Sequence, residues 1–205
     1  MLYLIRHGAT VPNESQPPIL QGCGVDSDLS ATGREQAAAL ATRLADVPLA
    51  AVFASRLQRA QQTAAAVAEP HGLTVQTAAD IHEISAGSWE RQTWPQIMAD
   101  DPRGYARWAA APDRVAFPGG ESYLDVLARA QPVLERLAAE ASESRPVAVV
   151  AHRVVNRAVC GHLLGLDSLR WRDVPQDNAA VNVLQWHDDR LRLVTLNSQT
   201  RLPRR

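Results

Sequence analysis

The chain has 205 residues, of which 46% are hydrophobic and 21% are charged, a composition typical of one globular domain, which we expect over residues 1–205. The formal net charge of -1 argues against a protein that holds nucleic acid or a membrane surface by bulk electrostatics. All 21 basic residues are arginine, which excludes mechanisms that need a lysine and leaves arginine as the residue for anion binding.

A short hydrophobic run from Leu2 to Ile5 leads directly into Arg6, His7 and Gly8. This pattern predicts a buried strand that carries two polar side chains at its tip. The planar guanidinium of Arg6 matches phosphate or carboxylate oxygens, and His7 beside it is a candidate nucleophile or base. Gly8 would let the backbone turn tightly and approach a ligand. An anion site is one interpretation, and polar residues at the end of an ordinary strand are the other.

Two helices and a second strand are predicted next. Residues 11–29 carry prolines and glycines without periodicity, which predicts a long loop. Thr32 and Glu35 form a candidate capping box for a helix that runs toward Pro48. Residues 50–54 form the next expected strand, followed by a helix that ends at Gly72.

The middle of the chain predicts a lid and a long helix. Residues 73–75 are a candidate third strand, and the region after it is rich in Trp, Pro and Gly. We expect short helices there, forming a lid-like insertion at about residues 84–120. Ser122 and Asp125 are typical of a capping box, and Leu124 belongs to the expected apolar face of the following helix.

The last third predicts three more strands. Residues 147–150 form an uninterrupted apolar run, typical of a strand buried on both faces, which leads into His152 and a helix ending at Gly165. Two strands around a turn at Asp188 and Asp189 follow. We expect the residues after Ser198 to be disordered.

This alternation of strands and helices predicts an α/β fold, a three-layer α/β/α arrangement with a mainly parallel central sheet and helices on both faces. Ligands in such folds bind beyond the carboxyl ends of the strands. Arg6 and His7, Arg59 near the start of a helix, and His152 each follow a different predicted strand. The sequence therefore predicts that these residues meet at one edge of the sheet, where their charge would suit an anion such as phosphate.

Cys23 and Cys160 stand alone, without metal-ligand spacing, and we expect free thiols and no metal site. The four apolar residues before Arg6 are too few for a signal peptide, and no apolar run approaches the length of a membrane span. We therefore expect a soluble protein of the cytoplasm.

Five sequence blocks resemble the histidine phosphatase superfamily, which includes cofactor-dependent phosphoglycerate mutases and many small phosphatases. The blocks are LIRHGAT at residues 4–10, SRLQRAQQTA at 55–64, IHEISAGSWE at 81–90, PGGES at 118–122 and VVAH at 149–152. A lone RHG is a weak signal, but five blocks in the family's order extend the resemblance over nearly the whole chain.

The resemblance implies a phosphoglycerate mutase-like fold and a phosphohistidine mechanism that needs no cofactor. In it, His7 attacks phosphorus, and Arg6, Arg59 and His152 surround the oxygens of the transferred group. Glu83 would donate a proton to the leaving alkoxide and then deprotonate the attacking water. A solvated carboxylate is the alternative interpretation of Glu83.

The resemblance also implies that Asn13, Gln21 and Gly22 contact substrate or phosphate. Two positions depart from the family pattern, because Ile19 stands where an arginine is frequent and Arg153 where a glycine is common. We expect Arg153 to replace the missing loop arginine and bind a second anionic group, unless it points to solvent or pairs with a lid carboxylate.

The expected substrate is a small phosphorylated metabolite. The C-terminal part is similar to metal-independent phosphoserine phosphatases, but Ala86 stands where we expect those enzymes to carry a histidine. Phosphoserine is thus one candidate among several.

Three functions remain open: a phosphomonoesterase, a cofactor-dependent phosphoglycerate mutase, and a non-catalytic phosphate-binding module. The short interval between Glu83 and His152 resembles the compact phosphatases, and the presence of every expected catalytic residue argues against a dead module. The sequence leaves the oligomeric state open, a homodimer included.

Overall fold

The computed structural model describes residues 1–199, so that most of the tail after Ser198 lies outside the described residues. The strands are β1 (Leu2–Arg6), β2 (Ala51–Ala54), β3 (Val75–Thr77), β4 (Val147–Ala151), β5 (Val181–His187) and β6 (Arg190–Ser198). The α-helices are α1 (Val11–Glu14), α2 (Ala31–Leu44), α3 (Gln58–Ala68), α4 (Trp94–Asp100), α5 (Pro102–Ala110), α6 (Tyr123–Glu140) and α7 (Arg153–Leu163). Three 3-10 helices, η1 (Glu69–His71), η2 (Gly87–Trp89) and η3 (Ser168–Asp173), complete the set in this range.

The central sheet has the strand order β3-β2-β4-β1-β5-β6. The first four of these strands are parallel, whereas β5 pairs antiparallel with both β1 and β6. In the β1–β4 register Ile5 lies opposite Val150 and Arg6 lies opposite Ala151, so the two strands end side by side. The predicted α/β fold with a mainly parallel sheet is confirmed.

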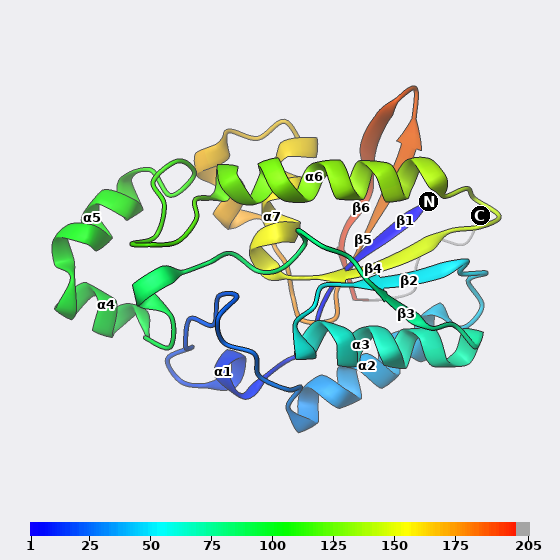
Figure 1. The fold of residues 1–205 in the computed structure, drawn as a ribbon, viewed down its shortest axis with the longest axis horizontal. Helices are drawn as coiled ribbons and strands as arrows, with labels where there is room; N and C mark the ends of the chain where they lie inside the picture. Colours follow the sequence, from blue (N-terminus) through cyan, green and yellow to red (C-terminus); the bar gives the residue numbers. More distant parts are fainter. Residues whose placement is uncertain (200–205) are drawn as a thin grey trace.

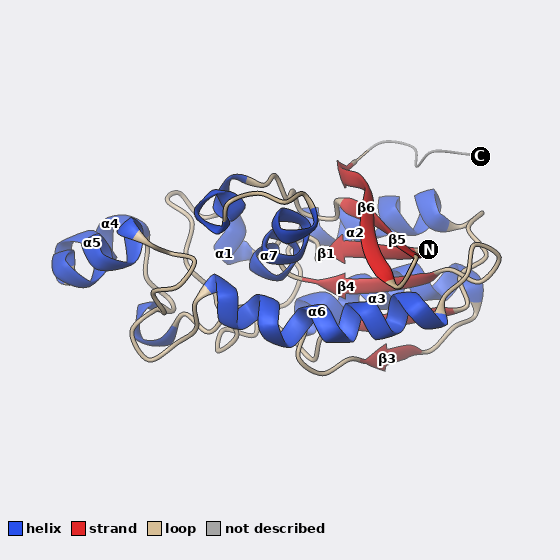
Figure 2. Ribbon diagram, turned by 90° about the horizontal axis from the view of Figure 1, so that it is seen from above, coloured by secondary structure: helices blue, strands red, loops and turns tan. Residues whose placement is uncertain are grey.

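Helices cover both faces of the sheet (Figures 1 and 2). Leu2 and Leu4 point to the face packed by α6 and α7, and Ile5 points to the face packed by α2 and α3. Every residue of β4 is buried, as the uninterrupted apolar run predicts. Because successive side chains of a strand alternate between faces, this one sheet supplies two hydrophobic cores.

The short helices α4 and α5 extend beyond the carboxyl ends of the parallel strands (Figure 1). Aromatic rings pack them against the adjoining loops: Trp108 stacks on Trp94 at a centroid distance of 4.9 Å and on Phe117 at 5.1 Å. Short helices therefore occupy the expected lid region. Their action as a lid remains a prediction.

Local details differ from the sequence expectations. Helix α2 begins earlier than predicted, with Ser30 as its N-cap, whose Oγ accepts a hydrogen bond from the Gly33 N–H at 3.0 Å. The expected capping box at Thr32 and Glu35 is wrong, because both positions lie inside the helix. The Ser122 capping box of α6 is confirmed, but Leu124 is 40% exposed and does not face the core.

The third strand and the loop at residues 11–29 also differ from the sequence expectations. The third strand is shifted from residues 73–75 to Val75–Thr77, and the four-residue helix α1 interrupts the loop expected at residues 11–29. Between β5 and β6, Asp188 and Asp189 have φ angles of 50° and 54°. These left-handed values are typical of a tight hairpin turn, as the sequence indicates.

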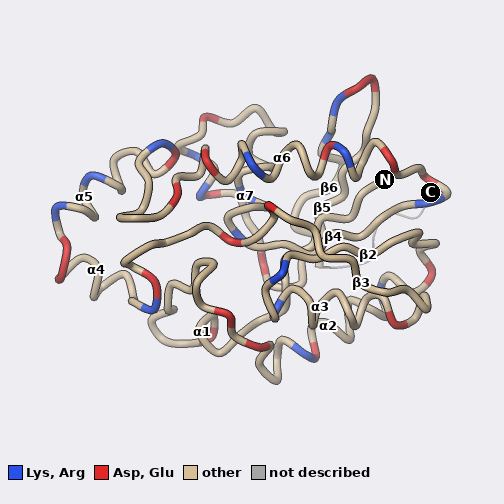
Figure 3. The backbone as a smooth tube through the Cα atoms, in the orientation of Figure 1, with Lys and Arg blue, Asp and Glu red and all other residues tan. Residues whose placement is uncertain are grey.

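Acidic and basic residues are interspersed along the backbone (Figure 3). Within residues 1–199, no helix is both long enough and apolar enough to cross a lipid bilayer.

Candidate active site

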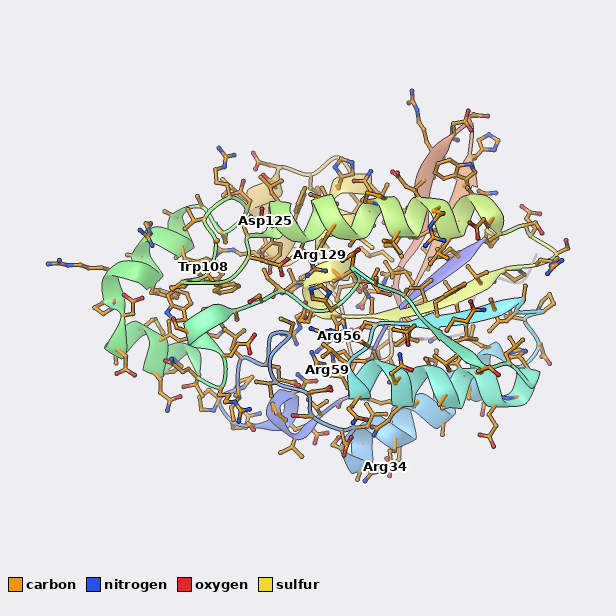
Figure 4. The ribbon with its side chains drawn as sticks, viewed as in Figure 1. Arg34, Arg56, Arg59, Trp108, Asp125 and Arg129 are labelled. Atoms are coloured by element: carbon orange, nitrogen blue, oxygen red, sulfur yellow. The ribbon has the colours of Figure 1, made fainter. Side chains whose placement is uncertain are left out.

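The strand ends bring the predicted site residues together. His7 follows β1, His152 follows β4, and their ring centroids lie 5.1 Å apart. Arg59, in the first turn of α3, reaches the same place, with its Nε 3.3 Å from His7 Nε2. Arg56 is exposed, as expected for a surface residue, whereas Arg59 is 1% exposed; both are labelled in Figure 4. The predicted convergence at one edge of the sheet is confirmed.

His7 is held in one orientation and one tautomer. Its Nδ1 lies 2.6 Å from the carbonyl oxygen of Gly8, and since a carbonyl only accepts, Nδ1 carries the proton. The lone pair is then on Nε2, beside the guanidinium of Arg59. Burial, and then the positive charges of Arg59 and Arg6, hold the pKa of His7 well below its usual 6.5. Nε2 accepts a hydrogen bond from Arg59 Nε at 3.3 Å. A neutral imidazole whose second ring nitrogen carries no proton can act as a nucleophile.

Arg6 is a buried cation with few partners. Its Nη1 donates to the carbonyl oxygen of Gln176 at 2.7 Å, and its Nε is buried without a hydrogen bond partner among the described residues. Burial, and then the charge of Arg153, lowers the pKa of Arg6 to about 9. An anion placed here would supply both a hydrogen bond acceptor and the missing negative charge.

Arg59 is fixed by backbone carbonyl groups. Its Nη1 donates to Val25 at 2.7 Å and its Nη2 to Gly22 at 2.9 Å. Burial lowers its pKa as well. In residues 1–199 neither this side chain nor Arg6 forms an ion pair with a carboxylate. The two guanidinium groups therefore concentrate positive charge that the protein itself does not neutralise by direct pairing.

His152 is fully buried behind His7. Its Nε2 lies 2.6 Å from Ser55 Oγ, and its Nδ1 has no hydrogen bond partner in the described part of the chain. Burial and the charge of Arg59 hold the pKa of His152 well below 6.5. If the Ser55 hydroxyl donates to Nε2, Nδ1 keeps its proton and can donate it to an oxygen of an anion.

Glu83 is placed at the N-terminus of α7. Its Oε1 accepts hydrogen bonds from the backbone N–H of Ile84 at 2.9 Å and of Val154 at 3.2 Å. The side chain is 9% exposed and lines the same pocket as His7. The interpretation of Glu83 as a fully solvated carboxylate is therefore wrong, because the fold fixes it beside the candidate nucleophile.

The pocket has a volume of about 90 Å³. Its lining contains Arg6, His7, Asn13, Gln21, Gly22, Arg59, Glu83 and Arg153, which are all of the predicted site residues except His152. Pockets for drug-sized molecules are larger, roughly 300–1,000 Å³. The volume suits one phosphoryl group, with the rest of a substrate outside. A larger hollow of about 400 Å³ lies beside α2, but its lining contains neither histidine nor Glu83.

The loop residues Asn13, Gln21 and Gly22, which were predicted to contact substrate, line the pocket and contact neighbouring residues. The Oδ1 of Asn13 accepts from Asn178 Nδ2 at 3.3 Å, and Gln21 donates through Nε2 to Thr10 Oγ1 at 2.6 Å. The buried Oε1 of Gln21 has no partner within residues 1–199. Gly22 has a φ angle of 62°, and a Cβ there would collide with the Glu90 carboxylate. These residues shape the pocket, and their contact with substrate remains a prediction.

Arg153 lies at the pocket rim, as does Ile19. Its side chain is exposed, and no hydrogen bond or ion pair holds it in the described part of the chain. Partial burial, and then the charge of Arg157, lowers the pKa of Arg153. The alternative in which Arg153 pairs with a lid carboxylate is not found among these residues.

The structural requirement for glycine at position 8 differs from the one that the sequence suggested. A Cβ at this position would lie 2.5 Å from the carbonyl oxygen of Gly33. The glycine therefore serves the close approach of α2 to the end of β1, and its N–H donates to Thr63 Oγ1 at 3.0 Å. No sequence pattern links Gly8 to Gly33 across the intervening loop.

Sequence reasoning also missed several supporting residues. Asn178 donates through Nδ2 to the carbonyl oxygen of His7 at 3.1 Å, and Gln176 accepts from Arg6. Arg129 and Glu121 hold the loop that carries Glu83. Glu121 lies within the PGGES block, which is a signal, whereas nothing in the sequence marks Arg129 among the other helical arginines.

Within residues 1–199, no group of three or more His, Cys, Asp or Glu side chains could hold a metal ion. Cys23 and Cys160 are free thiols, as expected. Burial raises the pKa of Cys160 to about 12, so this thiol is unreactive at neutral pH.

The sequence is similar to those of known phosphatases. The sequence model of the histidine phosphatase superfamily (branch 1) matches residues 2–199. Phosphoserine phosphatase 1 of Hydrogenobacter thermophilus is 33% identical over 197 residues, which are 96% of this chain and 91% of that protein. Glucosyl-3-phosphoglycerate phosphatase of Mycobacterium tuberculosis is 36% identical over 178 residues, covering 83% of this chain and 78% of that protein.

A solved structure of the mycobacterial glucosyl-3-phosphoglycerate phosphatase, in complex with VO3, is similar to this chain throughout. The TM-score is 0.84 at 34% identity, and the match covers 97% of this chain and 99% of that one.

Proposed function

The chain belongs to the histidine phosphatase superfamily, and from this premise we propose that it is a metal-independent phosphomonoesterase that hydrolyses a small phosphorylated metabolite through a phosphohistidine intermediate. The observation that carries the proposal is the pairing of a neutral His7 with the buried cations Arg6 and Arg59 in a pocket of phosphoryl size.

In the first step, Nε2 of His7 attacks phosphorus and forms an N–P bond, while the P–O bond to the leaving group breaks. Arg6, Arg59 and Nδ1 of His152 stabilise the charge on the equatorial oxygens of the transferred group. Glu83 donates a proton to the leaving alkoxide, which departs as an alcohol. The guanidinium of Arg59 needs no reorganisation during the step, because backbone carbonyl groups already hold it in place.

In the second step, water attacks phosphorus and the N–P bond breaks, so that the lone pair returns to Nε2 of His7. Glu83, now ionised, takes the proton of the attacking water and is ready for the next cycle. Inorganic phosphate leaves the pocket.

The experiment that tests this function is a screen for phosphate release from a panel of phosphorylated metabolites. A hydrolase releases inorganic phosphate from at least one of them with kcat/KM in the range of typical enzymes, above about 10⁴ M⁻¹s⁻¹. The alternative mutase would instead interconvert phosphoglycerate isomers with little net release. A non-catalytic module would bind phosphate and turn over none of the compounds.

The first prediction concerns metal dependence. Turnover should be unchanged after treatment with EDTA, because the buried arginines supply the positive charge and no suitable ligand cluster lies within residues 1–199. The measurement compares kcat before and after chelation and after adding magnesium or zinc. Activity that vanishes with EDTA and returns with a metal would contradict the mechanism.

The second prediction concerns Arg153 and the substrate class. We expect the substrate to carry a second anionic group, a carboxylate or another phosphate, bound by the exposed guanidinium at the pocket rim. Arg153→Ala should raise KM about tenfold for such a substrate, equivalent to about 1.4 kcal/mol. Turnover of p-nitrophenyl phosphate, which lacks that group, should hardly change.

Arg56→Ala is the matched control, since Arg56 is also exposed but does not line the pocket. Equal losses on both substrates in the Arg153 variant would mean that Arg153 serves the transferred phosphate. No loss on either substrate would mean that it is a surface residue.

A further inference from the structure

We propose that Arg129 and Glu121 are positioning residues that hold Glu83 in line for proton transfer. This inference rests on the proposed function, because it gives Glu83 the role of proton donor and acceptor. Neither of these two side chains lines the pocket that contains His7.

Arg129 uses all of the N–H donors of its guanidinium in one place. Its Nη1 donates to the carbonyl oxygens of Asp80 at 2.7 Å and His82 at 2.9 Å, and its Nη2 donates to that of Glu83 at 3.2 Å. The remaining donors go to Glu121, from Nε to Oε1 at 2.7 Å and from Nη2 to Oε2 at 3.0 Å. One side chain on α6, labelled in Figure 4, therefore binds three carbonyl groups of the loop that carries Glu83.

Glu121 binds the same loop directly, in addition to its contact with Arg129. Its Oε2 also accepts from the backbone N–H of Ser85 at 2.8 Å. Burial alone would raise the pKa of Glu121, but the hydrogen bonds from Arg129 and Ser85 hold it below its usual value, so that it is ionised. The ion pair is largely shielded, with side-chain exposures of 15% for Arg129 and 22% for Glu121.

The loop needs such support because its own backbone does not stabilise it. Asp80 has a φ angle of 63°, a strained value for a residue other than glycine. Residues 80–85 lie in no helix or strand, so no regular ladder fixes the Glu83 carbonyl and the carbonyls before it. A displacement of about 1 Å at a catalytic group can lower the rate about a hundredfold. The hydrogen bonds from the Arg129 guanidinium therefore fix the backbone of the irregular loop that carries Glu83.

Two variants test the inference, Arg129→Lys and Glu121→Gln. Lysine keeps the charge but has three donors on one nitrogen, so it cannot bind three carbonyl groups and a carboxylate together. We expect kcat for an alkyl phosphate to fall about tenfold or more in each variant, with little change in KM. The rate with p-nitrophenyl phosphate, whose leaving group hardly needs a proton, should fall much less.

The decisive measurement combines each variant with Glu83→Gln. Once the carboxylic acid is gone there is nothing left to position, so Arg129→Lys should cause no further loss of kcat in the Glu83→Gln background. Arg136→Lys is the matched control, because Arg136 lies on the same helix and pairs with Glu140 at an exposed site. That control should leave kcat unchanged on both substrates.

Losses that are equal on alkyl and aryl phosphates, or that add to those of Glu83→Gln, would overturn the positioning role. Should Arg129→Lys fail to fold, the same comparison with Glu121→Gln decides, because glutamine retains an acceptor oxygen for Ser85. Failure of the proposed function gives a different result, since the unmodified protein would then form no phosphohistidine with any substrate.

Discussion

Replacing His7 by alanine is expected to lower kcat by at least about a thousandfold, because the variant has no nucleophile to form the covalent intermediate. The unmodified protein should accumulate a phosphate label on Nε2 of His7 when turnover is quenched in base, where phosphohistidine survives. The site of the label is then mapped by mass spectrometry. The expected atom is Nε2, because Nδ1 donates to Gly8 and is not free to attack.

His187→Ala is the matched control, because this histidine is exposed in the β5–β6 hairpin beside Asp188 and does not line the pocket. It should keep full activity and the label. Folding of the His7→Ala variant is checked by its circular dichroism and by binding of inorganic phosphate, which the arginines still support. A label on His152 or on a serine would contradict the assignment of the nucleophile.

Replacing Glu83 by glutamine is expected to lower kcat for an alkyl phosphate by about a hundredfold or more, the usual contribution of a general acid. Glutamine keeps an acceptor oxygen for the backbone N–H groups of Ile84 and Val154, so its position should be preserved. It cannot donate the proton that an alkoxide needs. The loss with an aryl phosphate should be less than about tenfold, because an aryl oxide leaves without protonation.

The measurement is a series of phosphate esters with leaving groups of different pKa, assayed for the unmodified protein and for Glu83→Gln. The dependence of kcat on the pKa of the leaving group should become steeper in the variant. Glu140→Gln is a suitable control, because this exposed carboxylate pairs with Arg136 on α6 and does not line the pocket. A parallel loss across the whole series would mean that Glu83 only places the substrate or the water.

The order of strands and helices follows from local sequence patterns. The apolar runs at residues 2–5 and 147–150 have no polar interruption, and such runs bury themselves in the middle of a sheet whatever their partners are. Because parallel strands place their carboxyl ends at one edge, the positions of His7, Arg59 and His152 after three different strands were enough to predict that they meet. The tertiary structure adds the chemistry of the meeting point, where burial and the charges of Arg59 and Arg6 keep His7 neutral.

Helix boundaries were less predictable where two polar residues compete. Ser30 and Thr32 both precede the apolar positions of α2, and the sequence favoured Thr32 because Glu35 completes a capping box. In the structure the loop before α2 is tied to the segment that follows β1, where Ser30 N–H donates to the carbonyl oxygen of Ala9 at 3.0 Å. The partner is 21 positions away in the sequence, and the contact helps to fix the start of the helix at Ala31.

The sequence by itself therefore determined the α/β fold, the edge of the sheet that carries the site, and the residue types gathered there. Only the tertiary structure decided which atom partners which: Gly8 against Gly33, Nδ1 of His7 on its neighbouring carbonyl, and Arg129 on the loop of Glu83. The physical reason is the separation in sequence of the residues that each interaction joins. Hydrophobic periodicity and strand ends act within one element, whereas a hydrogen bond partner or a missing Cβ depends on how distant elements pack, which no local pattern records.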